Sequence, residues 1–210
     1  MSTSDVFRRI VAKLDRAGVR YMLTGSFAGA YHGSPRATQD IDLVIDADEA
    51  QVRAFVQSLP SAEHYADESA ALEAFRDKTQ FSVIDLATGW KIDLIVRKSR
   101  PFSVEEFGRR RAVDFDGTTL SVATPEDLII AKLEWAHHGE STRQVEDVAA
   151  ILKLRVADLD AAYLRRWVAE LGLGPEWITA RARAGLGRPP ELVFRGLRLR
   201  SARRYQPRER

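Results

Sequence analysis

The fold is decided by two stretches, GSFAGAYHGSPRATQDIDLV at residues 25–44 and KIDLIV at residues 91–96. In both, carboxylates stand inside runs of Ile, Leu and Val that predict buried β-strands. Because the side chains of a strand alternate between its two faces, Asp40 and Asp42 share one face. If the strand that carries Asp93 pairs alongside, its carboxylate lies within about 5 Å of that pair.

Three carboxylates this close together repel one another, and the repulsion raises their pKa values. A divalent cation removes the repulsion, and carboxylate oxygens suit Mg²⁺. The alternative for any single Asp is an edge position that faces water. Asp46 and Asp48 fit that alternative, and Asp85 is expected to end a strand.

A Gly-Ser turn precedes the first carboxylate pair. Residues 19–24 predict a strand that ends at this turn, and residues 27–32 have the small side chains of a short, tightly packed helix. Gly25 allows a sharp turn and a close approach of the backbone to a ligand. Ser26 stands at the helix N-terminus, where free N–H groups and the helix dipole favour phosphate oxygens, although a plain helix cap explains it as well.

Three more residues are candidates for the same site. Arg36 can bind a phosphate through two hydrogen bonds, although it can equally be a solvated loop arginine. Thr38 shares strand parity with the first carboxylate pair and is expected to line the same face. Lys91 has the parity of Asp93, so its ammonium group projects into the site, where it contacts nucleotide or balances the acidic charge.

The second half of the sequence predicts a hairpin and then helices. Residues 113–122 predict the hairpin, around a turn that contains Asp-Gly. Thr124, Pro125 and Asp127 open a helix with a capping box. Lys132 borders the apolar stripe of this helix. It either contacts nucleotide phosphate or extends its charge outward from the edge of the core.

A second capping box at Ser141 opens a helix that runs to about residue 153. On this helix Asp147 is expected to form a salt bridge with Arg143, one turn earlier. His137 and His138 are adjacent and splay about 100° apart on a helix, so we do not expect them to bind zinc.

Three short motifs resemble those of the polymerase-β-type nucleotidyltransferase superfamily: Gly25-Ser26, Asp40-Ile41-Asp42 and Lys91-Ile92-Asp93. The closer likeness is to the AbiEii-type and MenT-type bacterial nucleotidyltransferases, which have a Gly-Ser turn, a DxD and a KxD. Those relatives also carry a helical lysine and an acidic helix motif, which resemble Lys132 and Glu146-Asp147 here.

The resemblance implies an α+β nucleotidyltransferase fold, in which helices pack a short mixed β-sheet. Residues 1–123 would be the nucleotidyltransferase core, residues 124–187 a helical C-terminal region, and residues 188–210 an Arg-rich tail. Within the helical region, further helices are predicted near residues 158–171 and 175–184.

The resemblance also implies roles for the motif residues. One Mg²⁺ bridged by Asp40 and Asp42 would hold the NTP, and a second Mg²⁺ shared with Asp93 would activate an acceptor hydroxyl. The catalytic set would be these three acids and Lys132. The nucleotide-binding set would be Gly25, Ser26, Arg36, Thr38, Lys91, Lys132 and Asp147.

Composition narrows the class of protein. The chain has 210 residues, of which 45% are hydrophobic, and this is enough for a sizeable core. The lack of Cys excludes disulfides and thiolate metal sites and fits a reducing compartment. We predict no signal peptide at the polar N-terminus and find no apolar run of membrane-spanning length. We therefore expect a cytoplasmic protein without membrane contact.

The net charge of +2 hides an asymmetry. Residues 181–210 contain ten Arg and two Glu, which gives +8 there and −6 over the rest of the chain. Such a segment can bind the phosphate backbone of a nucleic acid. The alternatives are a disordered tail that aids solubility or a segment that docks a partner protein.

We therefore expect a Mg²⁺-dependent nucleotidyltransferase that moves a nucleoside monophosphate from an NTP to an acceptor. By likeness to AbiEii and MenT proteins, the acceptor would be RNA, such as a tRNA 3′ end. The protein would then be the toxin of a toxin–antitoxin pair, with an antitoxin as its partner. The alternatives are an antitoxin-type enzyme that adenylylates a protein, a non-catalytic binding module of the same fold, and an antibiotic-modifying transferase.

Overall fold

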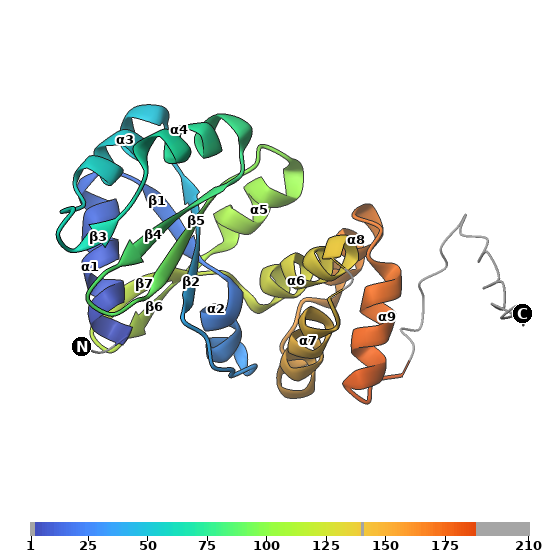
Figure 1. Cartoon of the computed structure of the whole chain (residues 1–210). Helices are drawn as coiled ribbons and strands as arrows, with labels where there is room; N and C mark the ends of the chain where they lie inside the picture. Colours follow the sequence, from blue (N-terminus) through green and yellow to red (C-terminus); the bar gives the residue numbers. More distant parts are fainter. Residues whose placement is uncertain (1–2, 140, 188–210) are drawn as a thin grey trace, which may run out of the picture.

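The computed structural model describes residues 3–139 and 141–187, and the predicted Arg-rich tail at 188–210 lies outside the described residues. A mixed β-sheet and the helices around it form one part, and a group of helices packs against one side of that part (Figure 1). This arrangement confirms the predicted α+β fold.

The sheet contains seven strands among the described residues, in the order β3-β4-β5-β2-β1-β7-β6. Parallel pairing joins β2 to β5 and β1 to β7, and the other neighbours are antiparallel. The strands are β1 (Arg20–Leu23), β2 (Asp40–Asp46), β3 (His64–Tyr65), β4 (Gln80–Asp85), β5 (Lys91–Val96), β6 (Arg111–Phe115) and β7 (Thr118–Val122).

Helices precede, connect and follow these strands. Those within the sheet part are α1 (Thr3–Arg16), α2 (Gly25–His32), α3 (Glu49–Gln57), α4 (Glu68–Asp77) and α5 (Pro101–Arg109). Those that follow it are α6 (Pro125–Gly139), α7 (Thr142–Arg155), α8 (Ala161–Glu170) and α9 (Gly174–Arg183). None of the helices within the described part of the chain is long and apolar enough to cross a membrane.

The two faces of the central strands have different partners. On one face the apolar side chains of β2 and β5, such as Ile41 and Leu94, join the main core with α1, α3 and α4. The opposite face carries a smaller apolar cluster that includes Val44 and Phe107. Asp40 and Asp42 lie on this second face because they share the parity of Val44.

The predicted hairpin is confirmed as β6 and β7. Its turn residues Asp116 and Gly117 have positive φ angles of 52° and 74°, as a tight two-residue turn requires. At the start of α6, the Asp127 backbone N–H donates to the Thr124 hydroxyl oxygen at 3.3 Å, as expected of a capping residue. The capping box predicted at Ser141 is wrong, because this residue precedes α7 without a side-chain cap hydrogen bond.

Three further aspartates were predicted to lie outside the acidic site, and they differ in position and burial. Asp46 lies on a central strand and accepts a hydrogen bond from Arg97 at 2.9 Å, so its predicted edge position is wrong. Asp48 is exposed, as expected, and caps α3. Asp85 ends β4, as predicted, although it is buried, with Arg9 and Thr88 as partners.

Candidate active site

A cleft of about 240 Å³ lies between the acidic face of the sheet and α6. Its lining contains most of the residues that the sequence predicted for a single site. The predicted residues in its lining are Gly25, Ser26, Arg36, Thr38, Asp40, Asp42, Asp93 and Lys132. Chain segments from three separate parts of the sequence therefore meet at one place.

Strand pairing brings the carboxylates together. β2 and β5 run parallel, with Asp42 directly opposite Asp93 and Asp40 opposite Lys91. This register confirms that the strand carrying Asp93 pairs alongside the DxD strand. Asp93 is buried and Asp40 is exposed, so the acidic pair at Asp42 and Asp93 forms the inner end of the cluster.

The Gly-Ser turn lies directly over Asp42. Gly25 has φ +63°, and a Cβ atom there would lie 2.6 Å from Cγ of Asp42 and overlap its carboxylate. The Ser26 backbone N–H donates a hydrogen bond to the Asp42 carboxylate. Thr24, rather than Ser26, occupies the N-cap of α2. Only glycine fits at position 25, because any side chain would displace this carboxylate.

The pKa of Asp42 is raised by burial and, next in weight, by the negative charge of Asp93. Asp93 itself accepts a hydrogen bond from the Ser82 hydroxyl at 2.6 Å and from the Lys91 ammonium at 2.8 Å. The hydrogen bond with Asp93 in turn raises the pKa of Lys91. Lys91 therefore neutralises the Asp93 carboxylate, while the ionised form of Asp42 remains unfavourable.

The acids fit a magnesium site that has few protein ligands. Among the residues that the structure describes, no three acidic or histidine side chains stand close enough to hold a metal ion by themselves. Mg²⁺ needs only one or two carboxylates when substrate phosphates and water complete its shell. Asp42 and Asp93 meet that requirement, since a cation between them would offset the burial of the Asp42 carboxylate and relieve its repulsion by Asp93, the two causes of its raised pKa.

A second charged cluster closes the cleft from the helical side. The buried ammonium of Lys132 on α6 donates to Asp147 on α7 at 2.6 Å and to Gln144 at 3.1 Å. Arg36 Nε lies 3.4 Å from the same Asp147 carboxylate. Burial lowers the pKa of Lys132, although the Asp147 carboxylate favours its charged form. Two cations therefore face the acidic strand from the other wall.

The predicted salt bridge between Arg143 and Asp147 is wrong. Arg143 is exposed, and the ion pairs that Asp147 forms within the described part of the chain are with Lys132 and Arg36. Asp147 does not line the cleft but holds two residues that do. Its position makes it a support for the cationic wall.

Sequence reasoning missed several residues that line the cleft or contact its carboxylates. Ser82 bonds to Asp93 from the neighbouring strand, and Gln144 and Trp135 line the cleft from the helices. The signal for Ser82 was a polar residue between Phe81 and Val83 in an otherwise apolar strand. No local pattern indicated that Trp135 would face the cleft.

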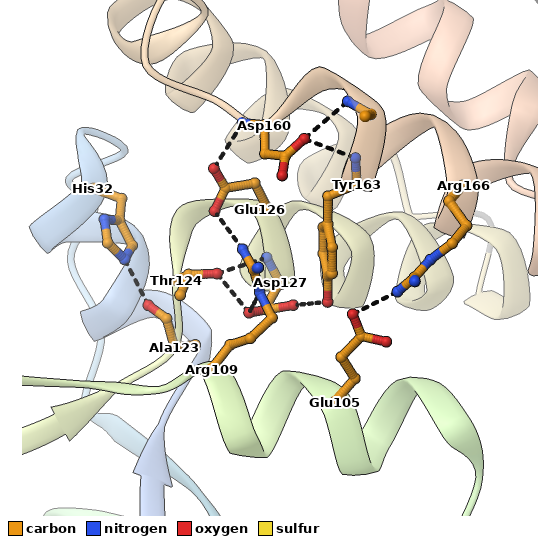
Figure 2. A network of polar contacts seen from close by, with 11 residues as sticks. His32, Glu105, Arg109, Ala123, Thr124, Glu126, Asp127, Asp160, Tyr163 and Arg166 are labelled. Carbon is orange, nitrogen blue, oxygen red and sulfur yellow. Dashed lines mark hydrogen bonds and ion pairs between the residues drawn. The ribbon is translucent and has the colours of Figure 1, made fainter.

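A polar network fixes α6 against the rest of the protein (Figure 2). Asp127, fully buried at the first turn of α6, lies 3.2 Å from Arg109 Nε of α5 and accepts a hydrogen bond from the Tyr163 hydroxyl of α8. Burial raises the pKa of Asp127, and its hydrogen bonds oppose that change. Glu126 accepts from the Asp160 backbone N–H at 3.0 Å. This network sets the position of the helix that carries Lys132.

A family model of the nucleotidyl transferase AbiEii toxin, from a type IV toxin–antitoxin system, matches residues 13–195. The chain belongs to the AbiEii nucleotidyltransferase family. Membership identifies it as a nucleotidyltransferase, as the sequence motifs predicted. No curated protein matches the chain.

Two solved structures are similar to this AbiEii-family chain. The antigenic nucleotidyltransferase-like protein of Paracoccidioides brasiliensis is 16% identical with a TM-score of 0.53, over 87% of this chain and 93% of that one. The antibiotic-resistance factor ANT(2'')-Ia is 15% identical with a TM-score of 0.54, over 82% of this chain and 93% of that one. At these identities the likeness shows a shared fold.

Proposed function

We propose that this nucleotidyltransferase uses Mg²⁺ to transfer a nucleoside monophosphate from an NTP to a hydroxyl group of RNA. The observation that carries the proposal is the pairing of Asp42 with Asp93 beneath the Gly25 turn, opposite Lys132. A nucleotidyltransferase needs carboxylates for a metal and cations for a triphosphate in one cleft, and both are present here.

Asp40, Asp42 and Asp93 would hold two Mg²⁺ ions together with the phosphates of the NTP. When bound, Mg²⁺ stabilises charge on the leaving pyrophosphate and lowers the pKa of the acceptor hydroxyl. Asp42 is held in place by the backbone N–H of Ser26, so its carboxylate keeps a fixed direction.

The chain's own cations orient the triphosphate. Arg36 and Lys132 line the cleft beside Ser26, at its helical wall, and would bind the β- and γ-phosphates. Thr38 accepts a hydrogen bond from the Asp40 backbone N–H at 3.1 Å and so fixes the start of the acidic strand. Positioning and neutralisation of charge supply most of the catalysis in phosphoryl transfer.

In the transfer step, the acceptor oxygen forms a bond to the α-phosphorus of the NTP. The bond from that phosphorus to the oxygen that bridges to the β-phosphate breaks, and pyrophosphate leaves with the electron pair. The acceptor proton passes to the Asp93 carboxylate, which is already fixed by Ser82 and Lys91.

An RNA acceptor, such as the 3′ end of a tRNA, is supported by the +8 charge of residues 181–210. The toxin role follows from the name of the matched family, and an antitoxin would then be its natural partner. Both are proposals about the setting of the reaction, and the chemistry at Asp42 does not depend on them.

The test is a transfer assay with α-³²P-labelled NTPs, total tRNA, and either Mg²⁺ or EDTA. We expect labelled tRNA with Mg²⁺, no label with EDTA, and no label with Asp42→Asn. The matched control is Asp116→Asn, which makes the same change at an exposed turn residue outside the cleft. Full activity of Asp42→Asn would place the site elsewhere, and label on an added protein in place of RNA would refute the acceptor.

A further inference from the structure

A second pocket continues the cleft beyond the acidic cluster. It encloses about 300 Å³ and shares Thr24, Ile95, Ala131 and Trp135 with the cleft. Its floor is the same face of the sheet, because Ile95 and Arg97 follow Asp93 with strand parity. The two cavities therefore form one groove with the acids in its first half.

The second pocket lies on the side of the acids from which an attacking hydroxyl must approach. In phosphoryl-type transfer the attacking and leaving oxygens stand roughly in line on opposite sides of the phosphorus. The groups suited to the pyrophosphate, Ser26, Arg36 and Lys132, line only the first half of the groove. An acceptor must then approach from the second half.

Trp135 stands at the junction of the two halves. It lies one turn after Ala131 on α6, and it is 60% exposed although it lines both cavities. The buried network at the start of α6 fixes the helix that carries this ring. An exposed and well-positioned indole is a stacking surface for a nucleobase.

The rim of the second pocket offers cations. Arg97 and Lys98 both line it, directly after β5. Lys98 is exposed, and no acidic side chain pairs with it within residues 3–139 and 141–187. A phosphate group at this rim could therefore pair with the Lys98 ammonium without breaking an existing ion pair.

The inner wall of the pocket carries a buried carboxyl group. Glu106 on α5 bonds to the Ser103 hydroxyl, while Arg100 beside it is committed to Glu134 through two hydrogen bonds. Burial raises the pKa of Glu106 to about 8. A carboxyl group in this position selects an occupant that brings hydrogen-bonding groups, such as a base or a ribose, over a wholly apolar one.

We propose that this second pocket is the acceptor site and binds the terminal nucleotide of single-stranded RNA, with its base stacked on Trp135 and its phosphate near Lys98. The inference rests on the proposed transfer reaction and names the substrate group that meets the acids. It makes Trp135 a binding residue for the acceptor and not for the incoming NTP.

The test compares the full-length protein with Trp135→Ala, Trp135→Phe and the control Tyr65→Ala, which removes an aromatic side chain of similar exposure outside both cavities. Michaelis constants are measured for total tRNA and for the NTP. We expect Trp135→Ala to raise the constant for tRNA about 5- to 150-fold and to change that for the NTP less than about twofold. Trp135→Phe should recover most of the loss.

Binding is measured separately, so that a failure of the transfer reaction can be told apart from a failure of the site. Single-stranded RNA should quench tryptophan fluorescence in the wild type and not in Trp135→Phe, even if no label is transferred. A raised constant for the NTP alone, unchanged constants for both substrates, transfer to protein only, or equal quenching in the two proteins would each overturn the proposal.

Discussion

The contact between the Gly25 turn and Asp42 makes a quantitative prediction. Gly25→Ala adds one methyl group at a position with φ +63°, where its carbon would lie 2.6 Å from Cγ of Asp42. Carbon atoms pack at about 3.5 Å or more, so the carboxylate must shift by about 1 Å. A displacement of that size in a catalytic group lowers the rate by about a hundredfold.

The same substitution also strains the backbone, and a second glycine measures that part alone. Gly117 has φ +74° and no atom within 4 Å of the position that a Cβ would take. Left-handed backbone costs about 1–2 kcal/mol for a residue with a side chain. At about 2–4 °C per kcal/mol for a chain of this size, Gly117→Ala should melt about 2–8 °C below the wild type. Gly25→Ala should melt at least as far below it, because the overlap with Asp42 adds to the same backbone strain.

The assay is labelled-NMP transfer under saturating NTP, with melting temperatures from circular dichroism. We expect Gly117→Ala to keep wild-type transfer and Gly25→Ala to lose at least about 99% of it at a temperature where both remain folded. Transfer by Gly25→Ala within about threefold of the control would show that the position of Asp42 does not limit the reaction.

Three other outcomes follow from the remaining contacts. Asp147→Asn should lower the free energy of unfolding by about 3 kcal/mol in urea titrations, because it leaves Lys132 buried without its carboxylate; no change would show that Lys132 has another counter-charge. Glu106 keeps its proton to about pH 8 in the folded protein but loses it near pH 4.5 in the unfolded chain. Its contribution to the free energy of unfolding, on the order of a few kcal/mol, is therefore fully present below pH 4.5 and is lost as the pH rises toward 8. Glu106→Gln should remove that slope, and an unchanged slope would assign it to other groups. Deletion of residues 188–210 removes eight arginines and two glutamates, and should weaken tRNA binding and flatten its dependence on salt; an identical slope would exclude this segment as an RNA contact.

The acidic strand could be predicted because its signal is local. A carboxylate within an apolar run has few explanations, and a period of two fixes which side chains share a face. The sequence therefore placed Asp40 and Asp42 together before any tertiary contact was known. The same strand pattern left the pairing of the Asp93 strand as a condition, and the register of β2 and β5 confirms it.

The partner of Asp147 could not be predicted in the same way. The local rule favours Arg143 one turn away, but an exposed pair of that kind contributes only about 0.3–0.5 kcal/mol. Lys132 is buried on a different helix, where an unpaired ammonium would be far more costly. Asp147 therefore pairs with the buried Lys132 and not with the exposed Arg143. Helical spacing placed Lys132 at the border of the apolar stripe, but it does not show that the other helix covers its ammonium group.

The two walls of the cleft together indicate why metal and nucleotide should bind together. Asp42 faces Asp93 on one wall, and its pKa is raised by burial first and then by the negative charge of Asp93, so ionised carboxylates are unfavourable there. On the other wall, Asp147 already offsets part of the charge of Lys132 and Arg36. A bare triphosphate would meet repulsion from the first wall and only partial attraction from the second. A triphosphate that arrives with a divalent cation would present positive charge to the carboxylates. The carboxylates would then attract the ligand that they repel when it comes without metal.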